Sequence, residues 1–182
     1  MPITISGSGT ITGISAGGLP DNCVTAADLA TTLDLSGSTL TLPDIEGTIV
    51  QIQSATTNTQ VDTTSTSFVS TGFGLSITPS SASSKILVLC LASSTPNSAG
   101  QGVYQKVVRG GSTDASNIVI NYNDSTAADT WRSNFMFGVD SPNTTSSTQY
   151  MLYFRAHYSS SSVYSNWGGS APQQMYLLEL GQ

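Results

Sequence analysis

The chain has few charged residues. Only 9% of its 182 residues are Asp, Glu, Lys or Arg, against about 25% in an ordinary globular domain. Eleven acidic and five basic residues give a formal net charge of −6. A nucleic-acid-binding protein needs clustered Lys and Arg to displace counterions from phosphates, and a polybasic membrane-surface protein needs a similar cluster. The composition therefore predicts no nucleic-acid partner and no polybasic membrane contact.

Residues that carry chemistry are equally scarce. Cys23 and Cys90 lie far apart and form no C-x-x-C pair, so we expect two buried thiols, with a single disulfide as the alternative. The one histidine, His157, cannot form a His-based metal site and is expected to be a structural residue. The sequence has no nucleophile elbow, phosphate loop or dinucleotide fingerprint. We expect no enzyme, cofactor or metal, with a weak calcium site at Asp124 and Asp129 as the alternative.

Long apolar runs are also missing, and we expect no leader segment. No stretch approaches the roughly 20 apolar residues of a membrane span. The N-terminal residues MPITISGSGT have neither the basic region nor the apolar region of a signal peptide. We therefore expect a protein that is made in a cytoplasm and does not insert into a membrane.

The sequence is rich in hydroxyl side chains, and its aromatic and basic residues are confined to one part of the chain. Ser and Thr together number 54, while 38% of residues are apolar, enough to build a core. All fourteen aromatic residues lie between Phe68 and Tyr176, and the first basic residue is Lys85. Turn residues cluster between Pro43 and Gly47. These shifts predict two parts, residues 1–46 and residues 47–182.

The first part has an apolar stripe but no partner element of its own. Thr25 and Asp28 favour the start of a short helix, in which Leu29 and Leu33 share one face. A segment of this length usually needs oligomerisation or another support to fold. We therefore expect residues 1–46 to serve attachment or self-assembly. The apolar residues expected to make these contacts are Ile3, Ile5, Ile11, Ile14, Leu29, Leu33, Leu35, Leu40 and Leu42.

The second part reads as successive strands without a convincing helix. Residues 86–91 are apolar at every position, which predicts a central strand covered on both faces. Many short strands at regular spacing predict a mainly β fold, an antiparallel β-sandwich of the jelly-roll type. The expected strands are 47–54, 58–63, 66–78, 84–92, 102–109, 116–122, 131–139, 148–158, 162–167 and 174–180.

One stretch has the composition of a binding loop. Residues 157–170 mix aromatic rings with Ser, Gly and Asn, as adaptable binding loops do. Tyr158, Tyr164 and Trp167 are the candidates for surface recognition, because flat rings can stack on sugars or proteins. The alternative is that these rings point into the sandwich or into a subunit contact.

Two stretches of the sequence resemble a known family. Residues 9–43 (GTITGISAGGLPDNCVTAADLATTLDLSGSTLTLP) resemble segments of tail-fibre and related virion structural proteins of tailed bacteriophages, especially those of marine and cyanobacterial hosts. Residues 71–88 (TGFGLSITPSSASSKILV) look like part of the C-terminal β-sandwich domains of such fibres. The closing strand at residues 175–180 is similar as well.

The resemblance implies a non-enzymatic virion protein, as a homotrimer. In that family an N-terminal segment attaches to other virion proteins and a C-terminal β-domain makes exposed contacts, including contacts with a host surface glycan or protein. This chain has no long repetitive shaft between its two parts. The resemblance therefore implies a short fibre or a fibre-like surface protein, with a capsid decoration protein or a lectin-like carbohydrate-binding module as alternatives.

Overall fold

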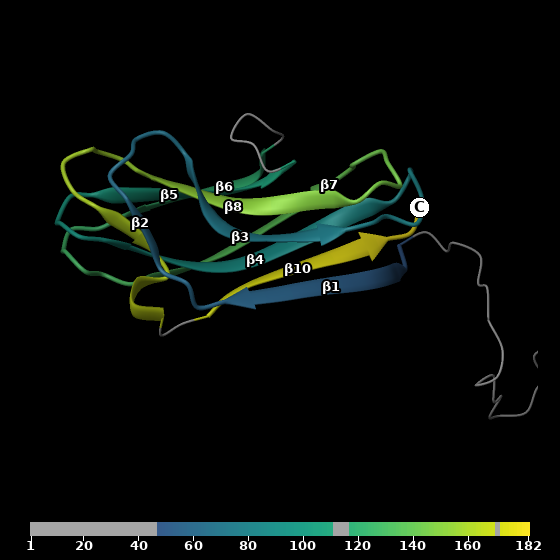
Figure 1. Cartoon of the computed structure of the whole chain (residues 1–182), viewed down its shortest axis with the longest axis horizontal. Coiled ribbons are helices and arrows are strands. Elements are labelled where there is room, and N and C mark those ends of the chain that lie inside the picture. Colours follow the sequence, from purple (N-terminus) through teal and green to yellow (C-terminus); the bar gives the residue numbers. More distant parts are fainter. Residues whose placement is uncertain (1–46, 111–116, 170–171) are drawn as a thin grey trace, which may run out of the picture. The chain divides into compact units, whose positions relative to one another are not determined.

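The computed structural model describes residues 47–110, 117–169 and 172–182. The helix expected from Thr25 and the apolar residues expected to mediate attachment lie outside this part of the chain. The described residues form β-strands and one short 3-10 helix (Figure 1). No helix among them is long and apolar enough to cross a membrane.

The strands form two antiparallel sheets. The first sheet contains, in spatial order, β1 (Ile49–Thr57), β10 (Gln173–Leu180), β4 (Lys85–Pro96) and β7 (Arg132–Asp140). The second sheet contains β3 (Val69–Ile77), β8 (Thr148–Ala156), β5 (Gly102–Arg109) and β6 (Asn117–Asp124). The first sheet is extended at one end by β9 (Val163–Ser165) and β2 (Val61–Thr63), and β9 is followed by the 3-10 helix η2 (Trp167–Gly169).

The strand order is that of a jelly roll. The two layers run β1-β10-β4-β7 and β3-β8-β5-β6, so strands from the first and second halves of residues 47–182 alternate in each layer. Such interleaving is the double Greek key of jelly-roll sandwiches. The predicted fold class is confirmed, and all ten expected strands are present with ends that shift by a few residues.

The long strand β4 organises the first sheet. One edge of β4 pairs with β10 over residues 85–91 and then with β9 over residues 94–96, while β7 pairs along the other edge. The alternate residues Ile86, Val88 and Cys90 point inward and are fully buried. They pack in the main core with side chains from both sheets, including Met136, Leu152 and Leu177.

The prediction that residues 86–91 are covered on both faces is only half correct. Their inward side chains are buried, but Leu91 is 38% exposed and Leu87 and Leu89 are half-buried. The sequence pattern indicates a buried strand because apolar residues occupy both faces. In the described part of the chain the second sheet covers only one of those faces.

A buried carboxylate closes one end of the core. Glu179 of β10 is fully buried, and it accepts hydrogen bonds from the Ser80 N–H (2.7 Å), the Ser80 hydroxyl (2.6 Å) and Gln51 Nε2 (2.6 Å). Burial raises the pKa of this carboxyl. The hydrogen bonds from Ser80 and Gln51 outweigh that effect and hold the pKa below its ordinary value. Glu179 therefore ties the turn after β3 to β1 and β10 as a charged acceptor.

The chain enters and leaves this fold at one end. The Gly47 N–H donates to the Gly181 carbonyl and the Gly181 N–H donates to the Thr48 carbonyl, both at 2.9 Å. Figure 1 shows the C-terminus at the end where β1 begins. The opposite end, here called the distal end, contains the start of β5 at Gly102 and the end of β8 at Ala156.

Candidate recognition surface

Aromatic and basic side chains gather on the outer face of the second sheet at the distal end. Tyr104 of β5 is paired in register with Tyr122 of β6 on one side and with Arg155 of β8 on the other. The sandwich thus brings together residues that are far apart in the sequence. The aromatic–cationic cluster, as it is called below, consists of Phe68, Tyr104, Lys106, Tyr122, Arg155, His157 and Tyr158.

The rings of this cluster form a continuous chain of contacts. The centroids of Tyr104 and Tyr122 lie 4.3 Å apart, and His157 stacks on Tyr158 at 4.1 Å. The Tyr122 hydroxyl is hydrogen-bonded to His157 Nδ1 at 3.0 Å. Partial burial, followed by the Asp124 carboxylate, raises the pKa of Tyr122, so its phenol stays protonated at neutral pH.

Two cations lie against the same rings. The Arg155 guanidinium lies 3.8 Å from the Tyr104 centroid, and the Lys106 ammonium lies 4.3 Å from the Phe68 centroid. These are two of the five basic residues of a chain with a net charge of −6. Cation–π contacts of this kind fix the rings and keep positive charge beside them.

The exposed members of the cluster are Tyr158 and Tyr122, with 54% and 40% of their surfaces accessible. Both are held from below. The buried side chain of Gln101 accepts from the Tyr158 N–H (2.9 Å) and donates to the Tyr158 carbonyl (2.6 Å). A Cβ atom at Gly102 would lie 2.5 Å from the Tyr122 ring, so glycine is what allows the ring to lie over β5.

The three residues predicted to serve recognition do not form one group of contacts. Tyr158 belongs to the aromatic–cationic cluster. Tyr164 of β9 and Trp167 of η2 pair edge-to-face with centroids 4.1 Å apart, and both are half-buried. Sequence composition indicated Tyr158, but it missed Tyr104 and Arg155, which meet through strand register, and Phe68, which lies just before β3 and contacts Arg155.

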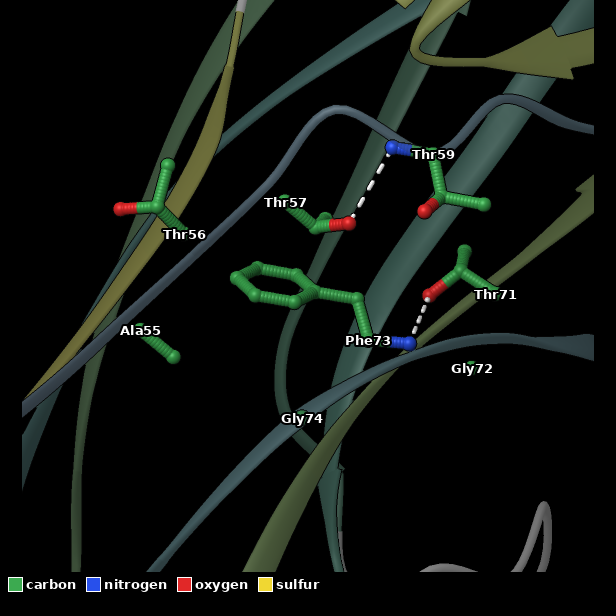
Figure 2. Close-up of a pocket in the computed structure, with 8 residues that line it drawn as sticks. All are labelled: Ala55, Thr56, Thr57, Thr59, Thr71, Gly72, Phe73 and Gly74. Atoms are coloured by element: carbon green, nitrogen blue, oxygen red, sulfur yellow. Dashed lines mark hydrogen bonds between the residues drawn. The ribbon is translucent and has the colours of Figure 1, made fainter.

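A shallow hollow between β1 and β3 offers no comparable chemistry. Figure 2 shows Phe73 at its centre, surrounded by threonines and two glycines. None of the eight residues that line it has an ionisable side chain; they are Ala55, Thr56, Thr57, Thr59, Thr71, Gly72, Phe73 and Gly74.

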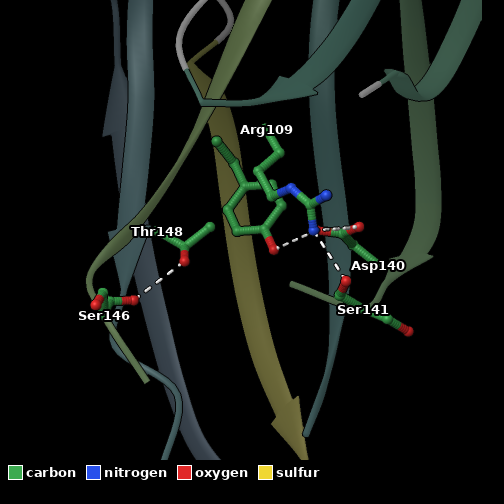
Figure 3. Close-up of polar contacts among 6 residues, drawn as sticks. Arg109, Asp140, Ser141, Ser146 and Thr148 are labelled. Atoms are coloured by element: carbon green, nitrogen blue, oxygen red, sulfur yellow. Dashed lines mark hydrogen bonds and ion pairs between the residues drawn. The ribbon is translucent and has the colours of Figure 1, made fainter. Parts of the chain in front are cut away.

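An ion pair near the end opposite the cluster is structural. Arg109 of β5 contacts Asp140 of β7 at 3.0 Å and donates to the Ser141 carbonyl at 2.9 Å (Figure 3). The buried Tyr150 donates its hydroxyl to Asp140 at 2.8 Å. Burial, then the hydrogen bond and charge of Asp140, raises the pKa of Tyr150. The group joins the two sheets, and its phenol is held as a hydrogen-bond donor.

Metal-ligating side chains do not cluster in the part of the chain that the structure describes. No three His, Cys, Asp or Glu side chains within residues 47–110, 117–169 and 172–182 lie close enough together to hold an ion. The Asp124 carboxylate instead accepts a hydrogen bond from the Ser125 N–H at 2.8 Å.

No protein-family model and no curated protein matches the chain. Among solved structures, one of the infectious bursal disease virus Gx strain is 13% identical over 73% of this chain and 39% of that chain, with a TM-score of 0.41. The infectious bursal disease virus VP2 subviral particle is 13% identical over 85% of this chain and 46% of that chain, with a TM-score of 0.40. This chain therefore spans less than half the length of either solved chain.

Proposed function

We propose that this chain is a non-enzymatic structural protein of a bacteriophage particle. In this proposal it is a short fibre or fibre-like surface protein, present as a homotrimer. Residues 1–46 attach it to other virion proteins, and the jelly-roll head is displayed for host adhesion. The proposal agrees with the viral origin of the solved chains described above, but it does not depend on them.

The observation that carries the proposal is that the N-terminal connection and the aromatic–cationic cluster lie at opposite ends of the head. The segment 1–46 joins the head at Gly47, and the aromatic–cationic cluster lies at the distal end. A protein attached through its N-terminal segment would therefore present this cluster away from the point of attachment. The resemblance of residues 9–43 and 71–88 to phage fibre segments supports the same division of roles.

The chemistry of the cluster suits a glycan or a protein surface. Exposed tyrosines offer rigid contact area at a low cost in side-chain entropy, and their hydroxyls can form hydrogen bonds. The half-buried Arg155 places positive charge beside the rings, which favours acidic sugars over neutral ones. Several copies on one particle would raise the avidity of such shallow contacts by roughly 10² to 10⁴.

Competition for adsorption tests the adhesion part of the proposal. The purified full chain should reduce adsorption of intact particles to host cells, and the double variant Tyr122→Ala/Tyr158→Ala should not. Trp131→Ala is the matched control, because Trp131 is 47% exposed and lies outside the cluster. Undiminished competition by the double variant would contradict a role for the cluster in adhesion.

Removal of residues 1–46 tests the attachment part. The shortened chain should keep the thermal unfolding transition of the head but should no longer be incorporated into particles. Incorporation of the shortened chain at the normal level would show that the head itself makes the contacts that hold it.

A lectin-like carbohydrate-binding module is the second candidate, and the exposed rings of Tyr122 and Tyr158 favour it. Antibody labelling of intact particles separates the alternatives. Label on the tail supports the fibre, and label on the capsid supports a decoration protein. Absence of label, together with glycan binding that is lost in Tyr158→Ala, supports the lectin.

A further inference from the structure

The outer face of the first sheet carries an apolar patch that covers β4, β7 and part of β10 and ends at Ile52 of β1. Its side chains point away from the second sheet. Phe135, Phe137 and Val139 of β7 are 60%, 64% and 57% exposed, and Ile52 of β1 is 57% exposed. The apolar outer face, as it is called below, consists of Ile52, Leu87, Leu89, Leu91, Phe135, Phe137, Val139, Tyr176 and Leu178.

Strand register makes this face continuous. Leu89 of β4 lies between Phe137 on β7 and Tyr176 on β10, in rows that cross the sheet. The next row runs from Val139 through Leu87 and Leu178 to Ile52. The rings of Phe135 and Phe137 stack with centroids 6.0 Å apart. Single exposed apolar residues are normal on a protein surface, but a patch this continuous marks an interaction site.

The size of the face is that of the apolar core of a protein–protein contact. Its rows of side chains cross strands spaced about 4.8 Å apart, and along β4 and β7 they cover residues 87–91 and 135–139, roughly 13 Å of strand. These dimensions give roughly a few hundred Å², against about 800 Å² on each partner of a standard interface. The face can therefore form the central part of a contact that the side chains around it complete.

The charge pattern selects the partner. The nine side chains of the face carry no charge, and Lys85, the one charged residue on the same side of these four strands, lies at the end of β4 beyond Leu87. Copies that meet through the nine residues bury no unpaired charge. Apolar sheet faces pack against one another about 10 Å apart, as the layers of a sandwich do. A partner with a charged or polar surface would leave its own groups unsatisfied against these rings.

We propose that the apolar outer face docks a second copy of this chain. The inference deepens the homotrimer of the proposed function and rests on it: when three copies turn this face toward a common threefold axis, each face packs against its neighbours, and the contact between copies lies on β1, β10, β4 and β7 of the head. It also explains why both faces of residues 86–91 are apolar: the second face is buried by assembly.

The mass of the full chain tests this docking. Wild-type protein should be multimeric at micromolar concentration by light scattering. The variant Phe135→Ser/Phe137→Ser should associate at least about a hundredfold more weakly, since it loses the two most exposed aromatic rings of the face. The matched control Ile120→Ser, on the second sheet and 53% exposed, should keep the wild-type mass. Unchanged association in the double Phe variant would overturn the proposal.

Thiol labelling gives a second test that does not weaken the interface. Ser54 lies on the same outer face, opposite Tyr176, and Ser76 is exposed on β3 of the second sheet. In a Cys23→Ser background, Ser54→Cys should react with maleimide more slowly in concentrated than in dilute protein, and Ser76→Cys should react equally in both. Labelling of Ser54→Cys as fast as that of Ser76→Cys at every concentration would overturn the proposal.

The outcomes separate this inference from the proposed function. A wild-type chain that is monomeric at all concentrations contradicts both the homotrimer and the docking. A multimer in which Ser54→Cys is labelled as fast as Ser76→Cys contradicts only the docking. Display of the head and its adsorption assay are then unaffected.

Discussion

A single added methyl group at Gly102 should displace the exposed ring of Tyr122. The new Cβ atom would lie 2.5 Å from the ring and from the phenolic oxygen. Ordinary carbon contacts lie near 3.5 to 4.0 Å, so the ring must move by about 1 Å or more. The phenyl ring is the free end of a side chain, so it moves more easily than the buried backbone of β5.

The expected energetic cost of Gly102→Ala is small, and the geometric effect is local. Moving the ring weakens the Tyr104–Tyr122 pair by about 0.5–1.5 kcal/mol. It also breaks the hydrogen bond to His157, which is worth about 0.5–1.5 kcal/mol. Replacing Gly by Ala returns about 0.4–1 kcal/mol by restricting the unfolded chain. The net destabilisation should be about 1 kcal/mol, or a few degrees in Tm.

Thermal unfolding and the adsorption assay together measure this prediction. Gly102→Ala should unfold a few degrees early and should compete poorly for adsorption, although no aromatic residue has been removed. Tyr122→Phe is the control, because it keeps the ring stack and loses only the hydroxyl. A Gly102→Ala protein with wild-type Tm and wild-type competition would refute the idea that Tyr122 must pack over Gly102 for the cluster to function in adsorption.

Three further changes test the interior. Because the pKa of Glu179 is lowered on folding, its contribution to stability is present above its unfolded value and is lost as the pH falls through the folded value. The urea midpoint of Glu179→Gln should therefore fall less than that of the wild type below about pH 4. At neutral pH the variant should be less stable by about 1–3 kcal/mol, because one amide oxygen replaces a carboxylate that serves three donors. Burial raises the pKa of Cys90 to about 12, so in a Cys23→Ser background a thiol reagent should react in urea and not with the native protein; rapid native labelling would contradict this. In Gly138→Ala the new Cβ atom would lie 2.8 Å from the Ile118 backbone oxygen, so thermal unfolding should show a loss of about 1–3 kcal/mol, and an unchanged Tm would contradict the close approach of β6 and β7.

The strands were predictable because each one carries its own pattern. In β8, Tyr150, Leu152 and Phe154 alternate with residues that point outward, and these three are buried. Alternation of this kind depends only on neighbouring residues, so it is visible without the fold. The same holds for the apolar run of β4, whose place at the centre of its sheet was predicted correctly.

The surfaces were less predictable, because they depend on which strands become neighbours. Periodicity shows that Phe135 and Phe137 share one face of a strand, but not whether another layer covers that face. The meeting of Tyr104, Tyr122 and Arg155 likewise follows from pairing between strands about 20 to 50 residues apart. The periodicity of each strand does not reveal which strands pair.

The pairing of the first strand, β1, with the last strand, β10, has a mechanical consequence. In the proposed arrangement, with residues 1–46 attached to the particle and the distal cluster bound to a host, a pulling force enters the head at Gly47 and is resisted at the distal end, so the load runs along β1. The ladder between β1 and β10 extends from Ile49 to Thr57, and its hydrogen bonds lie across that direction. They are loaded in shear and must break together rather than one after another. In the proposed arrangement the head therefore resists unfolding under load until all the hydrogen bonds of this ladder break.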